Sequence, residues 1–121
     1  MFLTGIFAVV KGRTAQAAVN KFAPDGAVIV EFTIGVGGGS TKYPVMWVHV
    51  TVWKDLGELA LPLLNDKGIA VEASGMLQVR LYEGKGGTNV WIALRNVREL
   101  KIYGRDGNLE KVLSGDKREV S

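Results

Sequence analysis

The segment Met46 to Leu56 alternates between two kinds of position with the period of a β-strand, in which successive side chains point to opposite faces. One face predicts a core, and the other carries two tryptophans about 20 Å apart at ~3.3 Å per residue. Two interpretations remain open: a surface that stacks a planar ligand, or aromatics covered by a second layer or a neighbouring subunit. The core face is Val48, Val50 and Val52, and the opposite face is Trp47, His49, Thr51 and Trp53.

The same period predicts further strands before and after this segment. The first is expected within residues 1–10, before Lys11 breaks the apolar pattern, and the second over Ala27 to Val36. Two more form a hairpin, Ala70 to Tyr82 and Val90 to Arg98, which Leu100 to Tyr103 prolongs. The expected inward residues are Val28, Val30, Phe32 and Ile34, then Leu77, Val79 and Leu81, then Val90, Ile92 and Leu94.

A short helix is expected over Asp55 to Leu64. Asp55 and Glu58 have the spacing of a capping box, and Pro62 should end the helix because proline lacks a backbone donor. The apolar positions at helical spacing are Leu56, Leu59, Ala60 and Leu63.

Glycine and proline mark the connections. Turns or loops are expected at residues 22–26, 37–44 and 83–88, and Gly75 allows a bulge inside a long strand. Three strands, a helix and two strands is the order of an all-β OB-fold, a five-stranded Greek-key barrel with a short helix between strands 3 and 4. We expect this domain to cover residues 1–104, followed by a short, flexible tail at 105–121 in which Leu109, Val112 and Leu113 could dock as a turn.

Composition removes several classes of function. The 121 residues fit one domain, and they include no cysteine and one histidine, which excludes disulfides, thiolate catalysis and multi-histidine metal sites. No carboxylate pair or triad stands out, so we expect no catalytic residue, no metal and no cofactor. No stretch approaches the roughly 18 apolar residues of a membrane span, and we expect a cytoplasmic protein without membrane contact.

The net charge of +3 resides in residues 1–104, which hold 11 Lys/Arg against 8 Asp/Glu. The outward positions of the predicted strands combine large aromatics with arginines. Aromatic rings stack unpaired bases of any sequence, and arginine adds phosphate and cation-π contacts. The pattern therefore indicates single-stranded nucleic-acid binding, although a subunit interface would also cover such a face. The candidate residues are Trp47, Trp53, Arg80, Tyr82, Trp91 and Arg95 on strands, with Lys42 and Lys85 in two loops.

The stretches WVHVTVWKDLGELALPLLNDKG and GMLQVRLYEGKGGTNVWIALRNV resemble the bacterial single-stranded DNA-binding proteins. The resemblance implies that Trp47, Trp53 and Tyr82 stack bases and that Arg80 contacts the backbone. It also implies single-stranded DNA as partner in replication, recombination or repair, and a homo-oligomer, commonly a tetramer, paired through residues such as Leu3 to Phe7.

Two departures from that pattern leave an alternative open. Val48 and His49 stand where the family usually has a His-Arg pair, and the chain ends GDKREVS, without the acidic, aromatic-tipped terminus that recruits partner proteins. We therefore expect no recruitment through such a tip. A related protein-interaction module of the primosomal-accessory type, which docks a partner or subunit through the same face, remains the second interpretation. His49 has no assigned role.

Overall fold

The computed structural model describes residues 4–38 and 40–115. Seven strands and one helix form there, where the sequence predicted five strands and a helix. The helix lies between the fourth and fifth strands. The elements are β1 (Ile6–Thr14), β2 (Val19–Phe22), β3 (Val28–Val36), β4 (Met46–Trp53), α1 (Lys54–Ala60), β5 (Ala70–Gly84), β6 (Gly87–Tyr103) and β7 (Leu109–Ser114).

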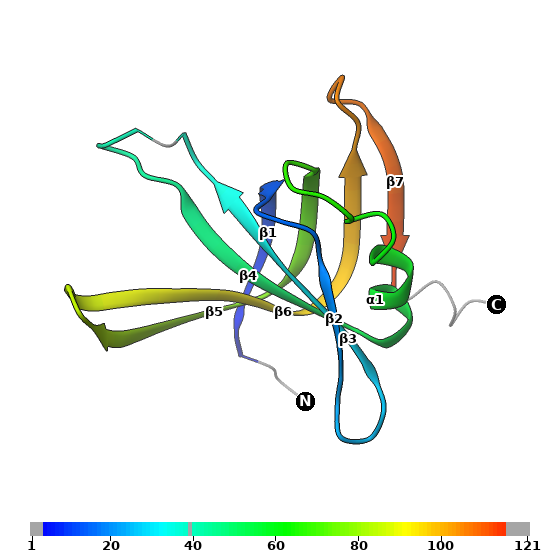
Figure 1. Ribbon diagram of the computed structural model, residues 1–121, viewed down its shortest axis with the longest axis horizontal. Coiled ribbons are helices and arrows are strands. Elements are labelled where there is room, and N and C mark those ends of the chain that lie inside the picture. The colour runs from blue at the N-terminus through cyan, green and yellow to red at the C-terminus, as the bar shows by residue number, and fades with distance from the viewer. Residues whose placement is uncertain (1–3, 39, 116–121) are drawn as a thin grey trace.

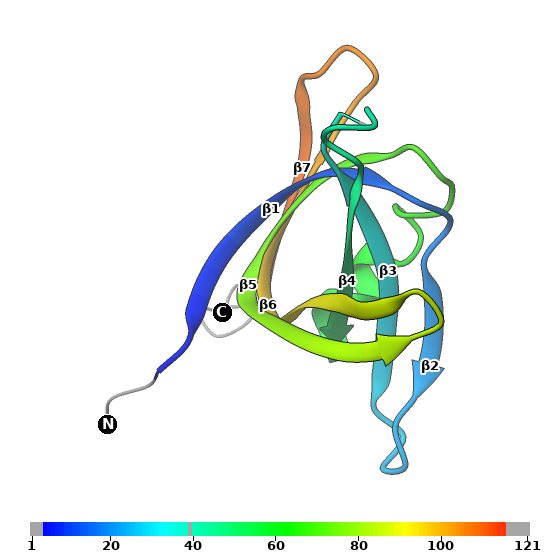
Figure 2. The same cartoon turned by 90° about the vertical axis from the view of Figure 1, so that its left-hand side faces the viewer.

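Five of the strands form a closed ring. The hydrogen-bonded order is β1-β5-β6-β4-β3, and β3 returns to β1 through the pairs Arg13 with Gly35 and Thr14 with Ile34. The β4–β6 pair is parallel and the others in the ring are antiparallel. In Figure 2 these strands surround the interior of the ring. The expectation of an all-β, OB-like fold is confirmed at this level.

The inside of the ring is filled largely by residues of β3 and β4 that the alternation assigned to it. The valines of β4 are buried, as are Val30, Phe32 and Ile34 of β3. Leu94 and Leu100 of β6 join them. Three strands contribute fully buried side chains to this core. Their packing fixes the position of β4, and therefore of the side chains on its outer face.

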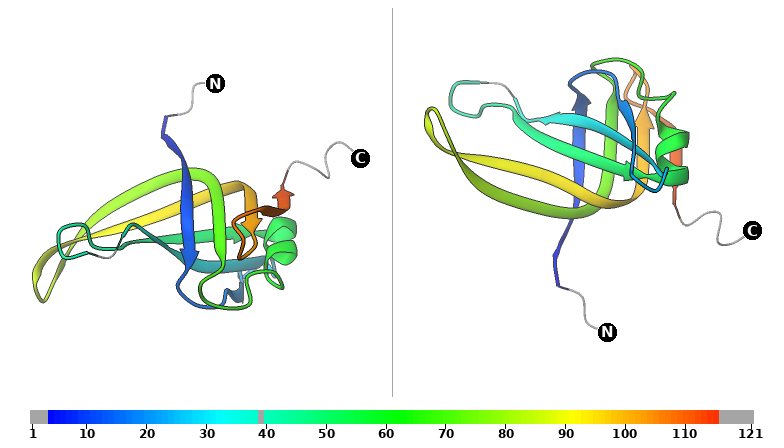
Figure 3. Two further views of the ribbon diagram at one scale, coloured as in Figure 1. Left: turned by 90° about the horizontal axis from the view of Figure 1, so that it is seen from above. Right: turned by 60° about the horizontal axis from the view of Figure 1, so that its bottom comes forward.

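Helix α1 packs at one end of the ring, as Figures 1 and 3 show. Its Leu56 and Ala60 are buried in the core, but Leu59, expected on the apolar face, is exposed. The predicted cap is also wrong, since the helix begins at Lys54 after Trp53, without a side-chain capping bond, and Asp55 lies inside the first turn. The helix ends before Pro62, as expected. No helix in the described ranges is long and apolar enough to cross a membrane.

Three segments differ from the sequence-based expectation in their extent. β1 continues through Lys11 to Thr14, where it pairs with both β5 and β3. β2 was not predicted; it forms a hairpin with β3 around the expected turn at Gly26, whose φ of +88° suits glycine. Residues 109–114, placed in a flexible tail, instead form β7 and pair with β6. The ring thus carries two added edge strands.

β5 and β6 bend sharply near Gly75, where a bulge was expected. Ser74 pairs with Glu99 and Met76 with Arg95, so residues 96–98 of β6 lie opposite Gly75 alone. A side chain at Gly75 would lie 2.6 Å from the carbonyl oxygen of Arg95, which explains the glycine. Beyond the residues that pair with β1 and β4, the two strands leave the ring as a long hairpin, the arm, defined as residues 78–91 (Figures 1 and 3).

Some residues of this hairpin that were expected to face the core do not do so. Val79, Leu81 and Val90 were predicted to face the core, yet all three are exposed. Their common side of the hairpin extends past the ring and has no second layer within the described part of the chain. Ala93, expected outside, is buried. The expected hairpin loop shrinks to a two-residue turn at Lys85 and Gly86.

Candidate nucleic-acid interface

A groove lies over the outer face of β4, between the β2–β3 hairpin and the root of the arm. Its lining includes His49 and Thr51 from β4, Arg80 and Trp91 from the arm, and Arg95 from the ring portion of β6. The parallel pairing of β4 with β6, which sets His49 beside Ala93, brings these distant segments together. Three of the predicted residues, Arg80, Trp91 and Arg95, therefore share one site.

His49 and Trp91 form a stacked pair in this groove. Their ring centroids are 3.7 Å apart and their planes differ by 4°. The imidazole Nδ1 lies 3.4 Å from the hydroxyl oxygen of Thr33. Burial lowers the pKa of His49 below its usual value, and the carboxylate of Glu31 partly opposes this by raising it. The imidazole is therefore held toward its neutral form in the middle of the groove.

The charges around the stack are mixed, with an excess of arginine. Glu31 is paired with Lys21, whose Nζ lies 2.8 Å from Oε1 of the carboxylate. Arg80 pairs across the arm with Trp91 and places its guanidinium carbon 5.9 Å from the Trp91 ring centroid. Arg80 and Arg95 both line the groove. Since the acidic side chain is already matched by a lysine, the two arginines leave the groove attractive to an anion.

Tyr82 continues the aromatic surface along the arm. It alternates with Leu81 on β5 and lies on the side that carries Arg80 and Trp91, because Arg80 and Trp91 are opposite each other and Tyr82 follows Arg80 by one strand period. Arg80, Tyr82 and Trp91 line one hollow, together with Leu81. The predicted stacking residue is thus next to the groove.

Trp47 and Trp53 lie at opposite ends of β4, both about half exposed at 51% and 47%. Trp47 lies over Gly35 of β3, where an added Cβ would be 2.8 Å from its ring carbon Cζ3. It lines a pocket that also contains Arg13 and Lys67. Neither tryptophan lines the groove itself. The aromatic side chains of β4 are therefore spaced along the strand, with Trp47 and Trp53 at its ends and His49 in the groove between them.

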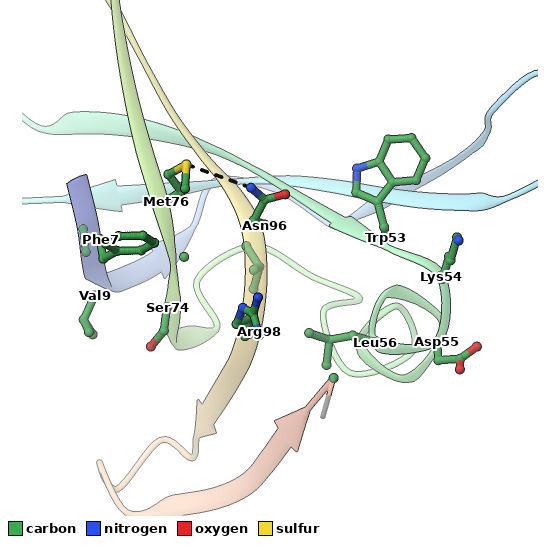
Figure 4. A pocket seen from close by; sticks show the side chains of 14 residues that line it. Phe7, Val9, Trp53, Lys54, Asp55, Leu56, Ser74, Met76, Asn96 and Arg98 are labelled. Carbon is green, nitrogen blue, oxygen red and sulfur yellow. Dashed lines mark hydrogen bonds between the residues drawn. The ribbon is translucent and has the colours of Figure 1, made fainter. Parts of the chain in front are cut away.

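Trp53 faces a separate pocket between β1, the bend of β5 and β6, and α1. Figure 4 shows Trp53 on the side of α1, with Phe7 and Val9 on β1 across from it. Between them the amide of Asn96 donates to the sulfur of Met76 at 4.0 Å. Exposed apolar residues line this pocket from two sides, which suits a protein partner as well as a base.

Lys42 and Lys85 remain at the tips of two projections. Lys42 places its Nζ 5.5 Å from the ring centroid of Tyr43 in the loop between β3 and β4, and Lys85 occupies the turn of the arm. That loop and the arm extend toward the same side of the molecule (Figure 1). Neither lysine is among the described residues that line the groove.

Sequence reasoning missed three contributors: the stack of His49 on Trp91, the ion pair of Lys21 with Glu31, and the cations beside Trp47. All depend on pairing between segments that are far apart in the sequence. Among the described residues, no group of three or more His, Cys, Asp or Glu side chains is arranged to hold a metal ion. The predicted subunit contact at Leu3 and the terminus after 115 lie outside the described residues.

The chain is similar in sequence to a known single-stranded DNA-binding protein. No protein-family model matches the chain. The chain is 26% identical over 119 residues to the mitochondrial single-stranded DNA-binding protein of Arabidopsis thaliana. This similarity covers 90% of the chain and 56% of that protein, so the chain spans little more than half the length of its relative.

Proposed function

We propose that this chain binds single-stranded DNA with little sequence preference and without catalysis. The observation that carries the proposal is the row of aromatics along β4 and the arm, exposed at Trp47, Trp53 and Tyr82 and half-buried at Trp91, with arginines between them. Bases would stack on Trp47, Trp53, Tyr82 and Trp91, and phosphates would lie near Arg80 and Arg95. Lys42 and Lys85 would close over the strand from the two projections.

Three findings support this proposal. The aromatic row lies on the outer face of a closed OB-like ring, and such faces bind oligonucleotides in OB-folds. Two arginines flank its centre. The relative from Arabidopsis thaliana is named as a single-stranded DNA-binding protein. We further propose that the five-strand ring is a Greek-key barrel, and that the protein serves DNA replication, recombination or repair.

Self-association belongs to the same proposal. The exposed apolar side chains of β1, together with those on the uncovered side of the arm, would be buried by a second copy of the chain. We propose a homo-oligomer, with a tetramer as the expected form. The residues involved would be Ile6, Phe7, Val9, Val79, Leu81 and Val90.

Poly(dT) titration tests DNA binding directly. The tryptophan fluorescence should quench on binding, and the affinity should fall as salt rises, because bound counterions are released. Stacking is worth about 1–3 kcal/mol per base, so a Trp53→Ala, Tyr82→Ala double variant should bind at least tenfold more weakly. Phe22→Ala is the matched control, since Phe22 is an exposed aromatic at the β2–β3 turn outside the aromatic row. Undiminished binding by the double variant would remove the site assignment.

A second function is favoured by one observation, the shared pocket of Trp53 with Phe7 and Val9. In this alternative the chain is a protein-interaction module, and the pocket docks a partner protein or another subunit. It predicts no quenching by poly(dT) and a blue-shifted emission of Trp53 in the free oligomer.

A comparison of poly(dT) with poly(U) tests the preference for DNA over RNA. Equal binding of the two would show that the groove recognises bases and not the sugar.

A further inference from the structure

The pocket beside Trp47 combines an aromatic ring with two cations. Arg13 comes from the end of β1 and Lys67 from the turn before β5. None of the described residues that line this pocket is acidic. It therefore differs from the central groove, where Glu31 offsets part of the positive charge.

The turn that carries Lys67 is fixed to β1 by Thr14. The buried Thr14 hydroxyl donates to the carbonyl of Asp66 at 2.8 Å and accepts from the amide of Ile69 at 3.0 Å. The Thr14 backbone adds two bonds, donating to the carbonyl of Ile69 and accepting from the amide of Gly68. Four hydrogen bonds through one residue hold this turn in register with β1. The backbone of Lys67, which lines the same pocket as Trp47, is thus held in place by the fold.

Arg13 is oriented by the same turn. Its Nη1 donates to the carbonyl of Gly68 at 2.9 Å. A guanidinium has five N–H donors in a rigid planar fork, so this one bond tethers the group to the turn and leaves other donors for a ligand. Arg13 is exposed, and an anion can reach it from solvent.

Glycine creates the space between the ring and the cations. A side chain at Gly35 would meet the Trp47 ring, and one at Gly12 would collide with the carbonyl of Gly35. Both glycines line the pocket. A flat ring over bare backbone, with two cations beside it, is suited to a nucleotide whose base stacks while its phosphate is neutralised.

The carboxylates near Arg13 and Lys67 do not line the pocket that contains Trp47. Asp66 and Glu110 line a different pocket that also touches Arg13 and Lys67. One Asp66 carboxylate oxygen already accepts the backbone amide of Lys67 at 2.7 Å. An anion is therefore favoured on the Trp47 side of the two cations, where no described lining residue is acidic.

We propose that Arg13 and Lys67 bind the phosphates flanking the base that stacks on Trp47. The single strand then leaves the β4 face at Trp47 and crosses the end of β1, over the turn formed by residues 66–69. This inference rests on the proposed DNA binding and adds two phosphate contacts to it. It also gives the strand a definite exit from the groove.

The salt dependence of oligo(dT) binding tests the two contacts. Each phosphate neutralised by a cation contributes about 0.7 to the slope of log K against log salt for single strands. Lys67→Gln and Arg13→Gln should each lower that slope by about 0.7, and the double variant by about 1.4. Lys101→Gln is the matched control, because it removes one lysine charge outside this pocket, from a side chain 3.6 Å from Glu72. Its slope should equal that of the wild type.

Lys67→Gln keeps the test valid if Arg13→Gln loosens the turn. Lys67 is exposed, and the bond to Asp66 comes from its backbone amide, so the substitution leaves the turn intact. A second readout is its coupling to Trp47: Lys67→Gln should cost several-fold less affinity in a Trp47→Ala background than in the wild type.

The outcomes separate this inference from the function on which it rests. If wild-type protein fails to bind oligo(dT), the proposed function fails first. Two results with a wild-type protein that binds would show that the phosphate contacts near Trp47 are wrong. Either Lys67→Gln keeps the full salt slope, or the binding free energy lost by Lys67→Gln simply adds to that lost by Trp47→Ala. The proposed binding site would then be limited to the central groove and the other aromatics.

Discussion

The imidazole of His49 lies parallel to the indole of Trp91, with ring centroids 3.7 Å apart. The contact joins β4 to the root of the arm across the middle of the groove. His49 covers one face of the Trp91 ring, and the guanidinium carbon of Arg80 also lies over this ring, 5.9 Å from its centroid. His49, which had no assigned role from the sequence, therefore packs directly against one of the predicted site residues.

The position of His49 predicts that stability falls as the solution becomes acidic. Burial lowers the pKa of His49 in the folded chain, while the unfolded chain keeps a value near 6.5. Below pH 6.5 the unfolded state binds the proton first, and the free energy of unfolding decreases until the folded pKa is passed. Chemical denaturation between pH 5 and pH 8 measures this change.

His49→Phe is the control for this pH dependence. Phenylalanine keeps a flat ring that can stack on Trp91 but does not titrate. The wild type should lose unfolding free energy relative to this variant as pH drops through about 6.5, with a constant difference above that value. Parallel curves over the whole range would show that burial does not penalise protonation of His49.

Self-association should depend on β1. Phe7 and Val9 are exposed in the single chain, so Phe7→Ser with Val9→Ser leaves the core unchanged and removes apolar area that a second copy would cover. We expect sedimentation equilibrium to give a multiple of the chain mass for the wild type and a lower mass for the double variant.

Val112→Ser provides the comparison for that experiment, because Val112 is an exposed apolar residue on β7, away from β1. It should keep the wild-type mass. A wild-type protein that sediments as a single chain, or a double variant with unchanged mass, would contradict the role of β1 in self-association.

Helix α1 offers a matched pair of leucines for stability. Leu56 is 4% exposed and reaches the core, while Leu59, one turn later, is 54% exposed. Leu56→Ala should cost about 2–5 kcal/mol through lost burial and a residual cavity, and Leu59→Ala less than about 1 kcal/mol. Urea denaturation compares the two. Equal losses would place Leu59 in an interface or reassign the buried face of the helix.

The local pattern predicted strands well where the ring covers them. β3 and β4 have the expected buried side because the core lies beneath each alternate residue. The same reasoning was wrong for Val79, Leu81 and Val90, since alternation separates the two sides of a strand but does not say whether a second layer exists on either. β7 was missed because its pairing with β6 supplies the order that its mixed sequence does not indicate.

The sequence predicts some features of the candidate site, and the tertiary structure decides the others. The aromatic and arginine types of the row, their alternation with apolar residues and the bend at Gly75 could all be read from the sequence, because they follow from strand period and glycine geometry. Which residues meet depends on contacts between distant segments. The parallel pairing of β4 with β6 brings His49 to Trp91, and the bonds of Thr14 place Lys67 in the pocket that Trp47 also lines. Closure of the ring sets these distances, and no local pattern encodes them.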